Sequence, residues 1–250
     1  MKTIWITGAS SGLGAEISKQ AQSKGYRIVK LARSFSTSKM ENQNIISVHM
    51  DLLDENQVMK TVKYLSEQGL APDVVINNAG IGIFKTAWDI NQQEAEQIFR
   101  VNVLGMMALT GAVIPIMKEK QSGHIIQIGS QAGKLATAKA SVYAASKHAV
   151  IGYSNAIRLE LKPFGIAVST VNPGPIATPF LKQADPSGSY ENSIKKWLLD
   201  PTKVAERVVR LIETPKREVN LPWWMNVAAK AHAVAPHLFE SIAGPFLTKK

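Results

Sequence analysis

The sequence predicts an α/β protein built on a single-domain, Rossmann-type, doubly wound parallel sheet flanked by helices. Short runs of apolar, largely β-branched residues alternate with longer segments whose apolar residues recur with a helical period. The short runs contain few polar residues, as expected of strands that are buried on both faces of a parallel sheet. Repeated strand-helix-strand units of this kind wind into one sheet with helices on both faces.

The expected elements follow one another without a repeat, low-complexity tract or linker. The helix expected at residues 54–68 places Val58, Val62 and Leu65 on one face. Residues 91–120 hold one long helix or two. The expected strands are residues 4–6, 27–32, 45–49, 74–76, 124–128, 167–171 and 218–221, and the other expected helices are residues 12–24, 142–161 and 201–213.

Composition narrows the classes of partner. The 250 residues include 29 Lys and Arg against 19 Asp and Glu, a formal charge of +10. The basic residues are scattered and are not interleaved with aromatics, which favours solubility and attraction of an anionic cofactor over binding of nucleic acid.

The absence of cysteine excludes disulfides, thiol nucleophiles and cysteine metal sites, and fits the cytoplasmic location that we expect. We expect neither a signal peptide nor an apolar window of the roughly 18 residues that span a bilayer.

A glycine-rich segment, residues 7–14, follows the first expected strand and opens the first helix. Glycine lets the backbone approach a phosphate, and the free N–H groups at a helix N-terminus favour an anion. The spacing of Gly8, Gly12 and Gly14 differs from G-x-G-x-x-G. The segment therefore predicts a site for a dinucleotide pyrophosphate, with a purely structural tight turn as the alternative.

The end of the second expected strand bears on the choice of dinucleotide. Enzymes that use NAD usually carry an acid there, which binds the ribose 2′-hydroxyl. In this sequence no acidic residue follows that strand until Glu41. Arg33 stands at the position where NAD-dependent enzymes carry the acid. A guanidinium can bind a 2′-phosphate, so NADP(H) is favoured over NAD(H). The alternative is that Arg33 is a solvated loop residue.

Tyr143 and Lys147 are one helical turn apart and share a helix face. A phenol, with a pKa of about 10, is a poor base at neutral pH. A neighbouring ammonium lowers that pKa, so we expect Lys147 to acidify Tyr143 for proton transfer to or from a substrate oxygen. Ser130 follows a strand, at the sheet edge where ligands bind, and can polarise the same oxygen. The alternatives are that Tyr143 and Lys147 are only a pair on the surface and that Ser130 only caps a helix or turn.

The motifs, and the order in which they follow one another along the chain, resemble those of the short-chain dehydrogenase/reductase family. The family pattern T-G-x-x-x-G-x-G matches residues 7–14, and N-N-A-G matches residues 77–80. Its serine precedes its Y-x-x-x-K by the spacing seen here between Ser130 and Tyr143. P-G-x-x-x-T matches Pro173, Gly174 and Thr178, and the matches run in order over residues 3 to about 180.

The resemblance implies roles for further residues. Asp51 is expected to touch the adenine, and Asn78 and Ala79 the adenosine ribose, unless Asn78 only holds a turn. Asn102 is expected to support a water chain to Lys147, unless it only bends its helix. The catalytic set is then Ser130, Tyr143, Lys147 and Asn102. The expected cofactor contacts are Gly8, Ser10, Ser11, Gly12, Leu13, Gly14, Arg33, Asp51, Leu52, Asn78, Ala79, Gly80, Tyr143, Lys147, Pro173, Gly174, Ile176 and Thr178, and no metal is expected.

The expected function is hydride transfer between NADP(H) and a small-molecule carbonyl or alcohol substrate, which we expect to be lipophilic. One alternative is a 3-oxoacyl thioester reductase. Another is a non-catalytic NADP-binding regulator, although such proteins usually lack the tyrosine or the lysine. A nucleic-acid binder would show strongly salt-sensitive binding. By analogy with the family, a homodimer or homotetramer is expected to form through the two long helices.

Within the single domain of residues 1–250, three parts are distinguished. Residues 1–175 form the expected cofactor and catalytic core, and residues 176–200 a substrate lid beside residues 81–88 and 131–140. Residues 222–250 form an apolar extension that is expected to close the substrate pocket, to contact a second subunit or a membrane surface, or simply to pack in the core. The lid residues singled out are Phe180, Leu181, Trp197 and Leu198, and those of the extension are Trp223, Trp224, Met225, Leu238, Phe239, Phe246, Lys249 and Lys250.

Overall fold

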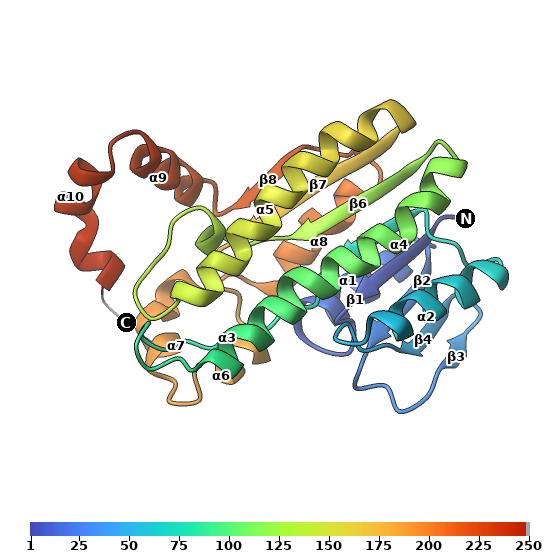
Figure 1. The fold of residues 1–250 in the computed structure, drawn as a ribbon, viewed down its shortest axis with the longest axis horizontal. Helices are drawn as coiled ribbons and strands as arrows, with labels where there is room; N and C mark the ends of the chain where they lie inside the picture. Colours follow the sequence, from blue (N-terminus) through green and yellow to red (C-terminus); the bar gives the residue numbers. More distant parts are fainter. Residues whose placement is uncertain (249–250) are drawn as a thin grey trace.

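The computed structural model describes residues 1–248, with side chains up to Gly244. Its strands are β1 (Thr3–Thr7), β2 (Arg27–Ala32), β3 (Lys39–Asn42), β4 (Ile45–His49), β5 (Val74–Asn77), β6 (Gly123–Ile128), β7 (Ile166–Pro173) and β8 (Glu218–Leu221). They form one sheet in the order β3-β4-β2-β1-β5-β6-β7-β8, parallel except for β3 (Figure 1). The strand order reverses between β1 and β5, and the predicted fold class is confirmed.

Helices cover both faces of the sheet (Figure 1). Along β1, Ile4 and Ile6 belong to the core beneath α1 and α8, whereas Trp5 belongs to the core on the opposite face. All three side chains are fully buried, which explains why the strand is continuously apolar. The helices that cover the sheet are α1 (Gly12–Ser23) and α8 (Pro201–Leu211) on one face, and α2 (Glu55–Glu67), α4 (Met106–Glu119) and α5 (Ser141–Leu161) on the other.

Residues 92–119 form one continuous helical stretch. α3 (Gln92–Phe99) leads through a π-helical turn, η1 (Arg100–Gly105), into α4. Contrary to our expectation, Gln92–Glu119 is long and apolar enough to cross a membrane. However, Leu109, Val113 and Met117 are fully buried against the sheet. The apolar character is therefore accounted for by packing in the core.

The sequence did not predict β3. Its four residues, Lys-Met-Glu-Asn, are all exposed and have no apolar alternation. The strand pairs antiparallel with β4, and the carboxylate of Glu41 lies 3.0 Å from the ammonium of Lys30 on β2. Charged side chains on a short edge strand also discourage pairing with another chain.

The chain after β7 contributes short helices around the carboxyl end of the sheet, and then a projection. α6 (Pro179–Ala184), α7 (Ser189–Ile194) and the 3₁₀ turn η4 (Lys195–Trp197) precede α8. Beyond β8, α9 (Trp223–Val234) and α10 (Pro236–Thr248) extend away from the body of the molecule (Figure 1). The side chain of Phe246, and residues Lys249 and Lys250, lie outside the described part.

We predict that His124 makes stability fall in mild acid. It lies buried in β6, its Nε2 is 2.8 Å from Ser169 Oγ, and burial lowers its pKa from 6.5 to about 4. The unfolded chain then binds a proton more readily than the folded chain. Stability from this group is complete above pH 6.5 and is lost as pH falls from about 6.5 to about 4.

The loss is about 3 kcal/mol at roughly 1.4 kcal/mol per pKa unit. Urea unfolding at pH 7 and pH 4 measures it. The variant His124→Asn should lose less stability over this range than the wild type, whereas His148→Asn, at an exposed site on α5, should behave like the wild type. Equal losses for wild type and His124→Asn would contradict the prediction.

Candidate active site

A cleft of about 880 Å³ lies at the carboxyl ends of the parallel strands. It is lined by the turns that follow β1, β2, β4, β5, β6 and β7. Every predicted catalytic or cofactor residue lines it except Gly14 and Asn102, which lie behind its wall. The predicted residues that line it are Gly8, Ser10, Ser11, Gly12, Leu13, Arg33, Asp51, Leu52, Asn78, Ala79, Gly80, Ser130, Tyr143, Lys147, Pro173, Gly174, Ile176 and Thr178.

The turn between β1 and α1 forms a close backbone cradle. Gly8 has a φ of +63°, and a Cβ on Gly14 would lie 2.3 Å from the carbonyl oxygen of Gly8. Ser11, at the N-cap of α1, makes no side-chain capping bond, and the first turn holds no acid. Since the N–H groups of this turn have no capping side chain, they suit the pyrophosphate of a dinucleotide.

The loop after β5 is tied to this cradle by hydrogen bonds. Thr7 Oγ1 accepts bonds from the backbone N–H of Asn78 at 3.0 Å and of Ala79 at 2.9 Å. Asn78 Nδ2 donates to the carbonyl of Thr7 at 2.9 Å. Asn78 therefore holds the turn in place, and it also lines the cleft.

Asn102, in the π-helical turn, secures the far end of the same loop. Its Oδ1 accepts a bond from the N–H of Ile81 at 2.8 Å, and its Nδ2 donates to the carbonyl of Ile81 at 2.9 Å and to Ser146 Oγ at 3.1 Å. A Cβ on Gly80 would lie 3.2 Å from Asn102 Oδ1 and 3.5 Å from Lys147 Nζ. The amide and the ammonium thus both lie against Gly80.

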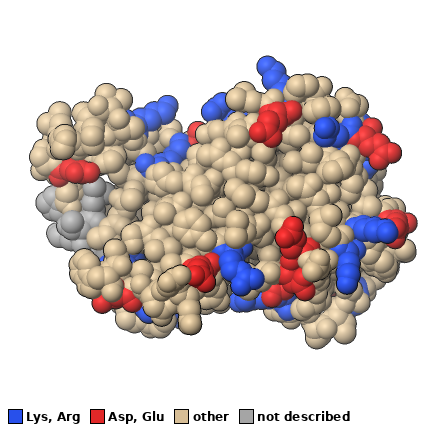
Figure 2. All heavy atoms as spheres, viewed as in Figure 1, with Lys and Arg blue, Asp and Glu red and all other residues tan. Residues whose placement is uncertain are grey.

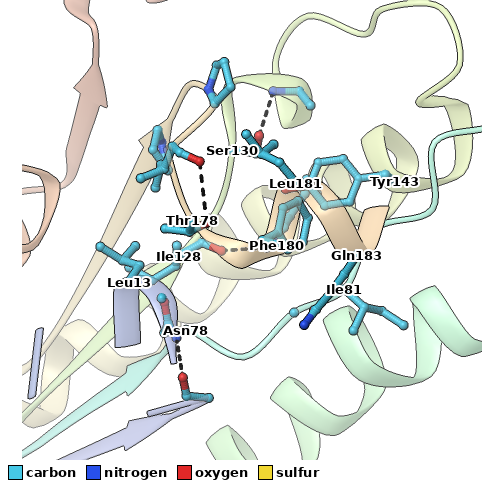
Figure 3. Close-up of a pocket in the computed structure, with 18 of the residues that line it drawn as sticks. Leu13, Asn78, Ile81, Ile128, Ser130, Tyr143, Thr178, Phe180, Leu181 and Gln183 are labelled. Atoms are coloured by element: carbon cyan, nitrogen blue, oxygen red, sulfur yellow. Dashed lines mark hydrogen bonds between the residues drawn. The ribbon is translucent and has the colours of Figure 1, made fainter. Parts of the chain in front are cut away.

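Ser130, Tyr143 and Lys147 meet at the carboxyl end of β6. Tyr143 and Ser130 are joined by a side-chain hydrogen bond. Lys147 Nζ donates to the carbonyl of Ile128 at 2.9 Å and lies 5.9 Å from the centre of the Tyr143 ring. Figure 3 shows Ser130 and Tyr143 together at the wall of the cleft.

Burial sets the protonation of this pair. It raises the pKa of Tyr143 to about 12, against the opposing effect of the hydrogen bond to Ser130, and it lowers the pKa of Lys147 to about 8. The expectation that the pKa of Tyr143 is lowered is wrong for this arrangement, because desolvation of the buried phenol dominates and raises it. The phenol therefore keeps its proton at neutral pH, and the ammonium holds its proton weakly.

Arg33 and Asp51 line the part of the cleft on the other side of β1. Arg33 follows β2 and is exposed, and Asp51 follows β4. Asp51 Oδ1 accepts a bond from the N–H of Leu53 at 3.0 Å, which fixes the carboxylate beside the turn. At least two strands, β1 and β5, thus lie between these two charged groups and Ser130, which follows β6.

Aromatic rings form the wall beside Tyr143. Phe84 packs edge-on against Tyr143, with ring centres 5.7 Å apart, and against Tyr190 at 4.6 Å. The ring of Phe180 lies 5.8 Å from that of Tyr143 (Figure 3). Among the predicted lid residues, Phe180, Leu181 and Trp197 line the cleft, whereas Leu198 does not. Tyr190 was not singled out, because α7 is too short to show an apolar period.

The first helix of the C-terminal extension also lines the cleft. Trp224, Met225 and Ala228 of α9 contribute to its wall, and the ring of Trp224 lies 5.3 Å from that of Trp197. Lys134 Nζ donates to Asn226 Oδ1 at 2.5 Å and forms an ion pair with Glu218 on β8. α9 thus forms part of the wall of the cleft, whereas contact of the extension with a second subunit or a membrane stays a prediction.

A doubly wound sheet with such a cleft at its switch point is a dinucleotide-binding fold. The family model described as short chain dehydrogenase matches residues 2–188. The chain therefore belongs to the short-chain dehydrogenase/reductase family of oxidoreductases. Solved structures with the same fold are complexed with NADP+ or NADH.

Individual relatives and a solved structure agree with this assignment. The chain is 31% identical to Oxidoreductase BOA17 of Botryotinia fuckeliana (strain B05.10), over 94% of each chain. It is 36% identical to an NADP-dependent 3-hydroxy acid dehydrogenase of Schizosaccharomyces pombe (strain 972 / ATCC 24843), over 72% of this chain and 73% of the relative. A short-chain dehydrogenase from Streptomyces avermitilis superposes with a TM-score of 0.81 at 23% identity, over 98% and 97% of the two chains.

The cradle predicts that Gly14→Ala weakens nucleotide binding at least tenfold. The added Cβ would lie 2.3 Å from the carbonyl oxygen of Gly8 and 2.5 Å from Asn78 Nδ2, so the turn must open. Titration with NADPH and with NADH, followed by nucleotide fluorescence, measures the loss. Gly152→Ala is the matched control, because a Cβ there meets no atom within 4 Å. Circular dichroism checks folding, and a folded Gly14→Ala protein with wild-type affinity would contradict the cradle.

Proposed function

We propose that the protein transfers hydride between NADP(H) and the carbonyl or alcohol carbon of a lipophilic substrate. The observation that carries the proposal is the meeting of Ser130, Tyr143 and Lys147 in the cleft that the glycine cradle opens into. Lys147 lies against Gly80, in the loop that is tied to the cradle, so a nucleotide held there extends toward the catalytic side chains.

The preference for NADP(H) is supported by charge. Arg33 lines the cleft after β2, and the position is free of the carboxylate that would repel a 2′-phosphate. A relative at 36% identity bears the name NADP-dependent 3-hydroxy acid dehydrogenase. Asp51 and Leu52 would flank the adenine, and residues 173–178 would cover the nicotinamide.

The bound nicotinamide supplies the hydride, and the protein supplies position and the proton. In the reducing direction, Ser130 and Tyr143 donate hydrogen bonds to the carbonyl oxygen, and Tyr143 transfers its proton to that oxygen as the carbon–oxygen double bond becomes single. A phenol with a pKa of about 12 is protonated before the reaction and acidic enough to protonate an alkoxide. Lys147, with a pKa of about 8, then returns a proton to the phenolate.

A lipophilic substrate is supported by the aromatic wall of Phe84, Phe180, Tyr190 and Trp197 beside the phenol. A 3-oxoacyl thioester also presents a ketone, and an assay with a thioester substrate distinguishes this alternative. A non-catalytic regulator would bind nucleotide without turnover. The cytoplasmic location and the homodimer or homotetramer stay predictions.

Tyr143→Phe should lower kcat for carbonyl reduction by about 10²- to 10⁴-fold, the range for a general acid. The ring and its contacts with Phe84 and Phe180 are kept, so affinity for the nucleotide should stay within about twofold. A panel of ketones, aldehydes and 3-oxoacyl thioesters with NADPH provides the assay. Tyr153→Phe, on the same helix, is the control and should turn over like the wild type. Full activity of Tyr143→Phe would refute the proposed proton donor.

Arg33→Ala should raise the Kd for NADPH about 10- to 100-fold, the equivalent of a lost charged hydrogen bond of about 1.5–3 kcal/mol. The Kd for NADH should change little, because NADH has no 2′-phosphate. Arg207→Ala, on the exposed side of α8, controls for the loss of one positive charge. Equal turnover of the wild type with NADPH and NADH would refute the role given to Arg33.

A further inference from the structure

Exposed apolar side chains are concentrated in the C-terminal extension. Within the described part of the chain, six of the fifteen large apolar side chains that are exposed lie in residues 222–244. Figure 2 shows this projecting part, at the left, as a surface on which few charged side chains appear. Contiguous apolar surface on a soluble protein usually marks a site of contact with another protein or with a membrane.

The exposed side of α9 is defined by helical spacing. Trp223, Val227 and Val234 follow one another at i, i+4 and i+11, and they are 73%, 54% and 86% exposed. On the opposite side, Ala229 is buried, and Met225 and Ala228 line the cleft. A helix that is apolar all round is normally buried on every side. Here only the inner side is covered by described residues.

α10 continues the exposed surface. Leu238 and Ile242 lie one turn apart and are 64% and 71% exposed. α10 packs against α9. We call the five exposed side chains of the two helices the tail face: Trp223, Val227, Val234, Leu238 and Ile242.

The charges around the tail face are mainly basic. Lys230 is exposed and follows Trp223 by two helical turns, so it stands among the apolar side chains of α9. Lys195 and Lys196 are exposed and precede Trp197, whose ring contacts that of Trp224. Glu240 is the acidic residue of α10, and its Oε1 lies 3.0 Å from His232 Nε2 on α9.

These features favour a bilayer over a second copy of the chain. The centre of a protein-protein interface is depleted in lysine, which would have to be desolvated. At a membrane surface, a lysine places its methylene stem in the apolar layer and its ammonium among the headgroups. Tryptophan is enriched at the level of the headgroups. A formal charge of +10 for the chain adds attraction to anionic lipid.

We propose that the tail face docks on the surface of an anionic lipid bilayer. Because α9 presents this face on one side and Trp224, Met225 and Ala228 to the cleft on the other, docking brings the cleft to the membrane surface. A lipophilic substrate then passes from the bilayer to the cleft along α9. This last step rests on the proposed function, whereas docking does not.

Flotation with vesicles tests docking on the full chain without turnover. Vesicles of phosphatidylcholine alone are compared with vesicles containing 30% phosphatidylserine. The wild type should bind both, and the anionic ones at least tenfold more tightly. The double variant Val227→Asp/Leu238→Asp should lose at least tenfold on both kinds of vesicle. Met59→Asp, a matched change at an apolar side chain 52% exposed on α2, should bind like the wild type.

Lys230→Glu separates the electrostatic part. It should weaken binding to the anionic vesicles about fivefold or more, at roughly that factor per basic residue, and leave binding to the neutral vesicles almost unchanged. NADPH titration of each variant reports whether the fold and the cradle are intact, and turnover of a water-soluble ketone should be unchanged in every variant.

Absence of wild-type flotation on both kinds of vesicle would overturn the proposal. It would equally be overturned if the double variant floated like the wild type. If the wild type did not float and the double variant converted an oligomer to a monomer in light scattering, the tail face would be a contact between copies. If the wild type bound vesicles but did not reduce any ketone, the proposed function would be refuted and docking would still hold.

Discussion

The loop that follows β5 is fixed at both ends by side chains, and the rest of the site depends on this constraint. On one side, Thr7 and Asn78 bond it to the turn after β1, and on the other the amide of Asn102 bonds both backbone groups of Ile81. Buried backbone groups that leave a sheet need new partners, and these side chains provide them. The nucleotide cradle and the ammonium of Lys147, which lie on opposite sides of this loop, are therefore held at a fixed separation.

Desolvation governs the chemistry available at the other end of the loop. Burial opposes the charged form of both Tyr143 and Lys147, so the two pKa values move apart, that of the phenol up to about 12 and that of the ammonium down to about 8. The carbonyl of Ile128 satisfies one donor of the ammonium. The pKa therefore rises from the ammonium to the phenol and from the phenol to the alcohol product. Proton transfer from the phenol to an alkoxide, and from the ammonium to the phenolate, is favourable at each step. The same burial that weakens the ammonium as an acidifying neighbour therefore makes it a better source of a proton.

The sequence determined the parts of the fold whose cause is local. β2 and β4 were predicted at their observed bounds, because their residues are mainly apolar and largely β-branched, as in strands buried on both faces of a sheet. The π-helical turn at Asn102 was not predicted, since it needs no special composition. β3 was missed because it is held by pairing with β4 rather than by its own pattern. The direction of the Tyr143 pKa was predicted wrongly, because sequence spacing gives proximity to a lysine but not the depth of burial.

The role of α9 shows why the extension escaped interpretation from sequence. Its apolar residues are spread over all sides of the helix, and a pattern without an amphipathic period does not say which side faces the protein. Contacts distant in sequence decide this: Trp197 packs on Trp224, and Lys134 bonds Asn226. Lys134 also pairs with Glu218 on β8, so the helix is anchored to the sheet close to the segment that carries Ser130. A change in the position of α9 must therefore alter the wall of the cleft, because Met225 on its inner side and Gly174 both line it, and a Cβ on Gly174 would lie 3.0 Å from Met225 Sδ. A contact on the outer side of α9 that shifted the helix would therefore also change the shape of the proposed substrate pocket.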